Sequence, residues 1–435
     1  MTGGTGVIEA RVRPPEATAI TTRTATPTPD VAPRQPRART AGLVSRCRPL
    51  VRPAAYYVVS RAVVLAATAV VVARHPTVRL TQALGTLFDG RWYLLIAQHG
   101  YPHHLVNEGD GSRWGFFPGF PLVVRGAAEI TRLSLPDAAL AAAFVFGLTS
   151  AVAIFLAVRE VAGTELANRA VLLYVCFPTS YVLSLAYTEG LFITAAALCL
   201  FALSRRAFVT AGLCACLAGF TRNAGVVVVV VVLVVALPAA WRERSWRPAL
   251  AAALAPVGLV AFMAYSQIMV GTPFAFLSAQ KFWGSHFVWF RAPVAALVGA
   301  VQTGPGRHGF GPDALASAAL VLGFLGLWWL DRMRTRPRPA DTFSATPAGA
   351  ATMIAVPATW WIYTFGALLV AYSAFFLDSI PRYTMAAFPL FLAFAWRLPR
   401  RWTVPVAGVL LCAQVALLVT VLSPLWHPVG SPLVP

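Results

Sequence analysis

Long apolar runs separated by short polar links dominate the chain from residue 54 onward. Runs of about 18 or more apolar residues are typical of transmembrane helices, because only helices and closed barrels satisfy every backbone polar group in lipid. These runs are too long and too uniformly apolar for barrel strands. We therefore predict an all-α polytopic membrane protein with about 11 transmembrane helices. The expected spans are 54–73, 136–157, 170–186, 190–204, 207–221, 224–240, 249–269, 313–330, 350–376, 384–396 and 403–422.

The links between these runs differ in length and charge. Two of them, 74–135 and 270–310, are long, and the first contains short amphipathic stretches. If the N-terminus is inside, every strongly basic link falls on the cytoplasmic side, as the positive-inside rule requires. The long loops then lie outside the cytoplasm. This topology depends on the short spans within 207–240, since loss of either one would invert everything that follows. The basic links are 159–169, 205–206, 241–247, 331–338 and 397–401.

The ends of the chain lack long apolar runs. Residues 1–45 are rich in Thr, Pro, Ala and Arg and lack the apolar core of a cleaved signal peptide. We predict a disordered basic cytoplasmic tail whose arginines lie against anionic lipid. Residues 46–425 are expected to form a single transmembrane unit, and 426–435 a short tail.

The composition supports the membrane assignment. The mean hydropathy is +0.68, and charged residues make up 12% of the chain, about half the fraction of a soluble protein. The net charge of +19 could suggest a nucleic-acid partner, but the arginines sit between apolar runs, so we expect membrane lipids as partners and no nucleic acid. No cysteine belongs to a CxxC pair, so we expect small core residues and no disulfide framework. The cysteines are Cys47, Cys176, Cys199, Cys214, Cys216 and Cys412.

The first long loop carries the first candidate for chemistry. It contains FDGRWYLLIAQHGYP at 88–102, in which Asp89 lies close to Arg91, Trp92 and Tyr93, and then WGFFPGFPLVVR at 114–125. A carboxylate near the membrane surface can act as a general base, and aromatic neighbours that exclude water would raise its pKa. The alternative is an interfacial loop with an ordinary aromatic belt.

Two further charged residues lie between apolar runs. Glu189 is in SLAYTEGLF (184–192), and Arg222 precedes Asn223 in AGFTRNAG (218–225). An ionisable group within a membrane unit is costly and marks a functional site by default. The alternatives are a helix-end contact with solvent for Glu189 and a snorkelling side chain for Arg222. Arg222 would face outside, against the positive-inside trend, which favours an anionic ligand.

The later segments add cations on the same side. VGTPFAFLSAQKFWG (270–284) contains Gln280, Lys281 and Trp283. DSIPRYTMAAFPLF (378–391) adds a further group to the predicted outer face. A lipid-linked phosphate would need such cations to neutralise its charge. The residues of this last segment are Asp378, Arg382 and Tyr383.

Metal chemistry has weaker support. His99, His103 and His104 lie near Asp89 and could ligate a metal with neighbouring carboxylates, but their spacing matches no established metal pattern. The chain also lacks a Walker loop, an HExxH motif and a GxSxG motif, so NTP hydrolysis and familiar soluble hydrolase chemistry lack support. We expect no metal site and no cofactor. The neighbouring carboxylates are Glu108 and Asp110.

Taken in order, these segments resemble the PIG-V-like mannosyltransferases, a family that contains the second mannosyltransferase of GPI-anchor synthesis and its bacterial relatives. Two departures stand out. Phe88 occupies a position where the family often has Trp, and Arg222 directly precedes Asn223 where the family often reads RxNG. Neither departure removes a charged group. The matching pieces are FDGRWY with the following IA and GY, FFPGFP, YTE at 187–189, TRN at 221–223, TPF with AQKFW, and PRY at 381–383.

The resemblance implies a GT-C glycosyltransferase fold and sugar transfer outside the cytoplasm. The donor would be a polyprenyl-phosphate sugar, with mannose expected, and the acceptor a glycolipid or glycan whose hydroxyl attacks with inversion. Asp89 would be the base, and Glu189 would orient the acceptor or support Asp89. A pool of positive charge would stabilise the leaving lipid phosphate without a metal. In this interpretation Arg222, Lys281 and Arg382 hold the phosphate, Trp92, Tyr93 and Trp283 stack on sugar or flank the lipid entrance, and Arg91, Asn223, Gln280 and Tyr383 complete the substrate-binding set.

Two other functions fit a polytopic chain with buried charges. A transporter or flippase of a lipid-linked or anionic solute would also place charged residues within a helix bundle. An inactive scaffold of a cell-wall assembly complex is the third possibility. No inverted repeat is apparent and the long loops lie on one side, which favours an outward-facing enzyme.

Overall fold

The computed structural model describes residues 1–3, 48–74, 79–86, 88–109, 111–283, 356–372 and 380–422. From Arg48 onward the chain forms one compact unit, and every regular element in the described ranges is a helix. This confirms the all-α prediction. The α-helices are α2 (Val51–Val72), α3 (Leu80–Gly85), α4 (Asp89–His99), α5 (Gly119–Thr131), α6 (Leu135–Cys176), α7 (Glu189–Ser204), α8 (Phe208–Thr221), α9 (Gly225–Glu243), α10 (Trp246–Leu254), α11 (Val257–Val270), α12 (Ala275–Ala279), α15 (Ala358–Tyr372), α16 (Ile380–Thr384), α17 (Pro389–Arg397) and α18 (Thr403–Val421). The 3-10 helices are η1 (Arg48–Leu50), η2 (Arg113–Gly115), η3 (Pro178–Ser184), η4 (Gln280–Trp283) and η5 (Arg400–Trp402).

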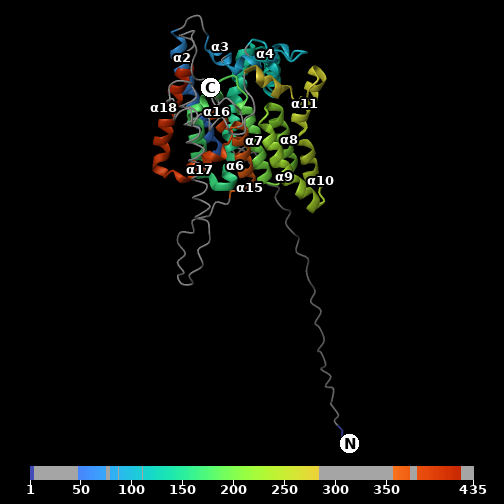
Figure 1. Ribbon diagram of the computed structural model, residues 1–435. Helices are drawn as coiled ribbons and strands as arrows, with labels where there is room; N and C mark the ends of the chain where they lie inside the picture. Colours follow the sequence, from blue (N-terminus) through green and yellow to red (C-terminus); the bar gives the residue numbers. More distant parts are fainter. Residues whose placement is uncertain are drawn as a thin grey trace, which may run out of the picture. The chain divides into compact units, whose positions relative to one another are not determined.

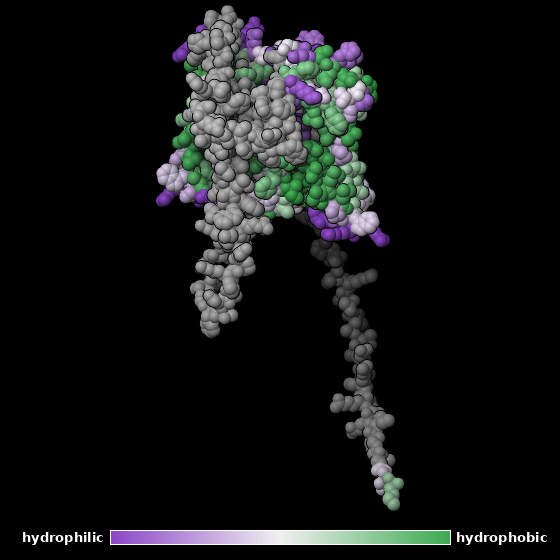
Figure 2. Space-filling view, viewed as in Figure 1, coloured by the Kyte–Doolittle hydropathy of each residue, from purple (hydrophilic) through white to green (hydrophobic). Residues whose placement is uncertain are grey.

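The helices carry the apolar surface of a membrane protein. Within the described ranges, 5 helical stretches are long and apolar enough to cross a membrane, and a bent pair, η3 with α7, raises the number to 6. On the coloured part of the face in Figure 2, apolar side chains cover the middle of the bundle and hydrophilic ones gather at its two ends. The expected span 313–330 and the tail 1–45 lie outside the described ranges, apart from residues 1–3. The 5 stretches are Arg48–Val72, Leu135–Cys176, Gly225–Glu243, Trp246–Val270 and Arg400–Val421.

The element α6 folds back on itself. The hydroxyls of Ser150 and Tyr174 lie 3.1 Å apart, although a straight helix would separate them by about 36 Å. The reversal occurs at Gly163, whose φ of 82° and ψ of 170° are non-helical. The two arms correspond to the predicted spans 136–157 and 170–186, and the reversal lies in the charged link between them.

Two of the expected spans contain more than one helical element, and a sharp bend follows one of the two. The predicted span 170–186 is helical only to Cys176, and η3 follows, turned by 104° from α7. The predicted span 249–269 consists of α10 and α11, with Ala255 and Pro256 between them. Both of these residues keep helical backbone angles, so Trp246–Val270 still runs as one stretch of membrane-spanning length. A continuous hydropathy pattern does not reveal the sharp bend before α7.

The short spans within 207–240 are both helical. Helices α8 and α9 are joined by the residues 222–224 alone and pack against each other, and α8 also packs against α7, α10 and α11. Figure 1 shows α8 and α9 beside α10, with α11 continuing upward from α10. Helix α8 has 14 residues, fewer than the roughly 20 residues that a helix needs to cross the hydrocarbon core of a bilayer.

The first long loop covers one end of the bundle. Figure 1 shows α3 and α4 across the ends of the long helices. The second long loop, described as far as residue 283, contacts the first through α12 and η2. An aromatic cluster joins them: Phe117 lies 4.5 Å from Phe262 and 5.2 Å from Phe276, measured between ring centroids. The described parts of the two predicted loops therefore form one cap over this end.

Candidate functional site

Two carboxylates occupy equivalent places in two helices. Asp89 is the first residue of α4, and Glu189 is the first residue of α7. The first turn of a helix carries a partial positive charge, which stabilises an anionic side chain there. A glycine follows each acid in the sequence, as DG at 89–90 and EG at 189–190.

These glycines allow close approach of the backbone. A Cβ on Gly90 would lie 2.4 Å from the carbonyl oxygen of Gly85, and one on Gly190 would lie 2.8 Å from the amide nitrogen of Gly147. Real Cβ contacts are never this short, so only glycine fits. Helix α4 is thereby held against the end of α3, and α7 against α6. The two glycines therefore allow close packing at the start of the helices that carry the two carboxylates.

Arg382 of α16 joins the two carboxylates. Its Nη1 lies 2.8 Å from Oδ2 of Asp89, and its Nε lies 3.2 Å from Oε1 of Glu189. Its Nη2 donates a hydrogen bond of 3.0 Å to the hydroxyl of Tyr383. Asp89 and Arg382 are 293 residues apart in sequence. The bridge therefore connects the first loop with the last third of the chain.

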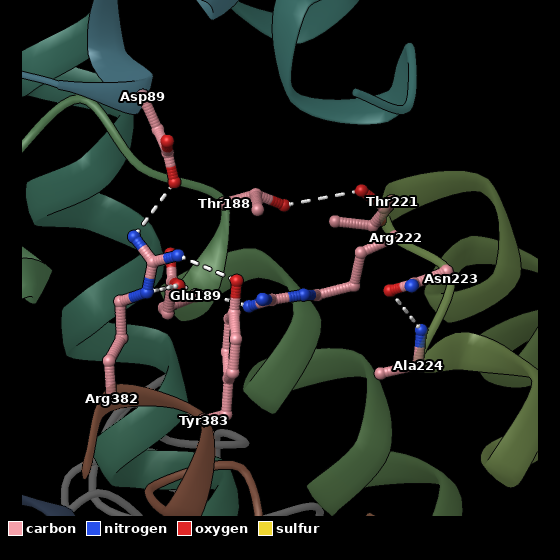
Figure 3. Close-up of polar contacts among 9 residues, drawn as sticks. All are labelled: Asp89, Thr188, Glu189, Thr221, Arg222, Asn223, Ala224, Arg382 and Tyr383. Carbon is pink, nitrogen blue, oxygen red and sulfur yellow. Dashed lines mark hydrogen bonds and ion pairs between the residues drawn. The ribbon is translucent and has the colours of Figure 1, made fainter. Parts of the chain in front are cut away.

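Arg222, at the end of α8, supplies a second cation. Its Nη1 donates a hydrogen bond of 3.0 Å to Oε1 of Glu189. The guanidinium lies 5.1 Å from the ring centroid of Tyr383 and 5.7 Å from that of Phe192. The Tyr383 ring is also 4.8 Å from the Arg382 guanidinium, and Figure 3 shows it between the two arginines. Aromatic faces stabilise cations, which helps two guanidinium groups to lie close together.

The four charged groups form a balanced and mostly buried cluster. Two carboxylates face two guanidinium groups, so the formal charges cancel. Glu189 and Arg382 are each 4% exposed, Arg222 is 15% exposed, and Asp89 is 28% exposed. Asp89 is thus the most accessible acid of the cluster. Because the cations already have partners, a further anion must compete with a carboxylate for them.

Some polar atoms beside the cluster are buried without a hydrogen-bond partner among the described residues. They include Oε2 of Glu189 and the hydroxyl of Tyr187, which directly precedes Thr188 in the same segment. The Tyr187 ring faces the Arg382 guanidinium at 5.0 Å. Buried polar groups usually have partners, so these two identify the inner wall of the site as incompletely satisfied.

Phe88, immediately before Asp89, has a strained backbone. Its φ of 46° and ψ of −114° lie outside the regions that a bulky residue normally adopts. Such strain costs on the order of 1–3 kcal/mol and persists where the surrounding structure enforces it. We therefore infer that the packing of α3 against α4 holds Phe88 in this conformation, directly before Asp89.

The structure brings together five of the predicted site residues. They come from four separate segments of the sequence, as the prediction of one shared face requires. The roles assigned to them stay predictions. These residues are Asp89, Glu189, Arg222, Arg382 and Tyr383.

The aromatic residues of the first loop are packed in the interior. Trp92 is 3% exposed and its ring stacks on Phe116 at 5.9 Å, while Tyr93 is 6% exposed and its ring contacts Tyr187 at 6.5 Å. The Arg91 guanidinium lies 4.8 Å from the Trp92 ring. These contacts give Trp92 and Tyr93 a role in seating α4, and their stacking on a sugar stays a prediction.

The other predicted substrate-binding residues lie apart from the cluster. Asn223 is exposed, and its side-chain oxygen accepts a hydrogen bond of 2.8 Å from the amide of Ala224. Lys281 is exposed on η4, beside the half-buried Gln280, and among the described residues it forms no ion pair with the cluster. The side chain of Trp283 and all of Asp378 lie outside the described part of the chain, so their roles stay predictions.

The histidines of the first loop are exposed, and Glu108 is engaged elsewhere. Its Oε1 forms an ion pair of 2.6 Å with Nη2 of Arg113, and its Oε2 accepts from the Arg113 amide. Burial raises the pKa of Glu108, but the hydrogen bonds and charge of Arg113 outweigh it and lower the pKa below its usual value. In the described ranges, no three His, Cys, Asp or Glu side chains come together, and Asp110 lies outside them. The exposed histidines are His99, His103 and His104.

Sequence reasoning missed two polar residues inside the bundle. Arg61 of α2 is 1% exposed and contacts the segment that leads to Glu189, and Gln414 of α18 is 0% exposed beside it. A charged residue in the middle of the apolar run 54–73 was the available signal, because such a residue is costly in a membrane.

No family model and no curated protein matches the chain. Solved structures do show similarity. ArnT from Cupriavidus metallidurans bound to undecaprenyl phosphate matches with a TM-score of 0.48 and 18% identity, covering 86% of this chain and 66% of that chain. The Archaeoglobus fulgidus oligosaccharyltransferase in complex with zinc and sulfate matches with a TM-score of 0.43 and 14% identity, covering 76% of this chain and 48% of that chain. The match to the oligosaccharyltransferase thus spans about half of its length.

Proposed function

We propose that this protein is a membrane glycosyltransferase of the GT-C type that transfers a sugar from a polyprenyl-phosphate donor to an acceptor hydroxyl outside the cytoplasm. The observation that carries the proposal is the cluster itself. An accessible carboxylate, Asp89, lies against a buried arginine, at the end of the bundle away from the described basic link at Arg205. The resemblance to the PIG-V-like family points to mannose as the sugar and to a glycolipid or glycan as the acceptor.

Asp89 is the proposed base. The acceptor hydroxyl gives its proton to the Asp89 carboxylate as its oxygen attacks the anomeric carbon. The bond between that carbon and the phosphate oxygen breaks on the opposite face, so the configuration inverts. Glu189 is buried and held by two arginines, which suits a positioning role and leaves the proton to Asp89.

The charges of this reaction match the cluster. The donor is a phosphodiester with one negative charge, and the leaving lipid phosphate carries two. Asp89 loses its charge at the same moment, because it takes the acceptor proton. Arg382, which pairs with Asp89 in the structure, then becomes available to the phosphate. The net charge of the site therefore stays constant through the transfer. Lys281, exposed on the second loop, would add a cation for the lipid phosphate.

The test uses purified protein in lipid, polyprenyl-phosphate mannose labelled in the sugar, and a membrane glycolipid extract. We expect transfer by the wild type and a loss of about 10²–10⁴-fold in turnover for Asp89→Asn, the range that a general base contributes. Asp137→Asn is the matched control, because its carboxylate pairs with Ser134 at the start of α6 and not with the cluster. We expect the control to keep wild-type turnover.

Two outcomes would contradict the proposal. If the wild type transfers no sugar from any polyprenyl phosphate tried, the transporter or flippase interpretation gains, because a buried charge cluster suits it equally. If transfer occurs but Asp89→Asn keeps near-native turnover, Asp89 is not the base. Parallel reactions with polyprenyl-phosphate glucose test the sugar, and reactions with a chelator test the expected metal independence.

A further inference from the structure

Arg61 is a buried cation with no carboxylate partner among the described residues. It lies in the middle of α2 and is 1% exposed. A charge in this position is expensive unless something compensates it. Its partners are carbonyl and hydroxyl oxygens, together with the side-chain oxygen of a glutamine. These partners are the carbonyls of Val175 and Ser180, the hydroxyls of Ser60 and Ser184, and Oε1 of Gln414.

Several of these partners lie at or just after the C-terminal end of α6. Helix α6 ends at Cys176, and the last carbonyls of a helix lack backbone donors. Such carbonyls also carry the negative end of the helix dipole, which compensates a nearby cation. The carbonyl of Val175 accepts from Nη2 of Arg61 at 3.1 Å and from Oγ of Ser60 at 2.7 Å. Nε2 of Gln414 donates to the carbonyl of Phe177 at 3.1 Å.

Arg61 also holds the element that follows. One nitrogen of its guanidinium, Nη1, contacts the carbonyl of Ser180 and the hydroxyl of Ser184, both in η3. In lipid, no water is available to satisfy these groups, so side chains must terminate a helix that stops inside the bundle. Arg61 thus allows α6 to stop and η3 to begin, ahead of the turn of 104° into α7.

The segment after η3 forms the inner wall of the candidate site. The amide of Ala186 donates to the carbonyl of Leu84 at 3.2 Å, just before α4 and Asp89. The hydroxyl of Thr188 lies 3.5 Å from the carbonyl of Thr221, next to Arg222. Glu189 follows directly. A shift of η3 would therefore move the carboxylate that holds both arginines.

We propose that Arg61 is a positioning residue of the site, which acts through η3 on the placement of Glu189. The effect on turnover rests on the proposed glycosyltransferase function, whereas the effect on η3 does not. The alternative is that Arg61 only stabilises the bundle and that its loss leaves the site unchanged in every folded molecule.

The test combines Arg61→Met, Arg61→Lys and the matched control Arg52→Met, which removes an exposed arginine from the same helix. Hydrogen exchange of peptides covering 178–189 is measured in lipid. We expect exchange at least tenfold faster in Arg61→Met, a smaller increase in Arg61→Lys, and wild-type exchange in Arg52→Met. Lysine keeps a charge and three donors but not the planar fork, so partial rescue is expected. Wild-type exchange in both Arg61 variants would overturn the proposal. If Arg61→Met does not fold, Arg61→Lys decides.

Turnover supplies the second readout. We expect Arg61→Met to lower kcat at least tenfold with KM for the donor within twofold, and Arg61→Lys to recover part of the loss. In the background of Glu189→Gln, Arg61→Met should cost less than twofold more, because both changes act through one carboxylate. If Arg61→Met lowers kcat by the same factor in Glu189→Gln as in the wild type, the proposed route through Glu189 is overturned. If the wild type transfers no sugar, the proposed function fails while the exchange measurement still tests Arg61.

Discussion

The two ends of the helix bundle use the same residue types in opposite ways. At one end, Glu189 and Arg382 are each 4% exposed and share an ion cluster. At the other end, Arg205 is 59% exposed and pairs with Glu160 at 3.1 Å. The two ends are the two ends of α7, about 24 Å apart for its 16 residues. Similar exposed pairs at that second end join Arg206 to Glu243 and Arg400 to Glu165.

The comparison distinguishes two kinds of charged residue. The exposed ones bear on the orientation of the protein in the membrane, and the buried ones form the candidate site. Exposed pairs contribute little to stability, because water solvates each partner well after separation. Their arginines agree with the predicted cytoplasmic orientation of that end whether or not they are paired. In the buried cluster each charge depends on its partner, because removing one leaves the other uncompensated. The positive-inside rule disfavours arginines at the end that holds the buried cluster, and the proposed function would account for their presence there.

The largest expected effect comes from Arg382→Met. It leaves Asp89 without its cation and Glu189 with Arg222 alone, so we expect a loss of about 3–5 kcal/mol in the free energy of unfolding. Thermal unfolding in detergent measures it. The double variant with Asp89→Asn restores the charge balance and should recover part of the loss. A melting temperature of Arg382→Met equal to wild type would contradict the comparison.

The next effect concerns the backbone that carries Asp89. In Gly90→Ala the new Cβ would lie 2.4 Å from the carbonyl oxygen of Gly85, which is backbone and cannot turn aside. We expect the free energy of unfolding to fall by about 1–3 kcal/mol, as for other overpacked sites. We also expect the folded variant to have a lower turnover, because the start of α4 carries Asp89. Gly126→Ala is the control, since a Cβ there meets nothing within 4 Å. Equal behaviour of the two variants would show that the close approach of α3 and α4 is unimportant.

The half-buried pair in the first loop offers an intermediate case. Glu108 is 20% exposed and Arg113 17%. Arg113 lowers the pKa of Glu108 on folding, so the pair contributes stability above the unfolded pKa and loses it as pH falls through the folded pKa. We expect Glu108→Gln to speed amide exchange at Arg113 at pH 7, and the difference from wild type to vanish well below about pH 4. A difference that persists at low pH would contradict this assignment.

The smallest effect is expected at the basic end. Arg205→Ala should change the free energy of unfolding by about 0–1 kcal/mol and leave turnover unchanged, because the pair with Glu160 is solvent-exposed. Thermal unfolding at low and high salt checks it. A loss comparable to that of Arg382→Met would remove the distinction between the two ends.

Much of the site could be predicted because its members break a strong rule. Asp89, Glu189, Arg222 and Arg382 are charged residues beside long apolar runs, and lipid makes each of them conspicuous. Arg61 breaks the same rule and yet was missed, because the surrounding run reads as a span with or without it. The structure packs the rings of Trp92 and Tyr93 in the interior, and their contact with a sugar stays a prediction.

The sequence by itself determined the helical class, most of the helix positions, the fold-back near Gly163 and the set of charged candidates. Hydropathy and charge act locally along the chain, so a one-dimensional pattern contains them. Only the tertiary structure decided which charges pair. Asp89 meets Arg382 across 293 residues, and Arg61 meets the end of α6 across 114. Helix packing fixes such contacts through the summed fit of many side chains, which no local pattern records. The broken span before Glu189 follows from the same packing, because the buried side chains of Arg61 and Gln414 satisfy the backbone groups that are freed there.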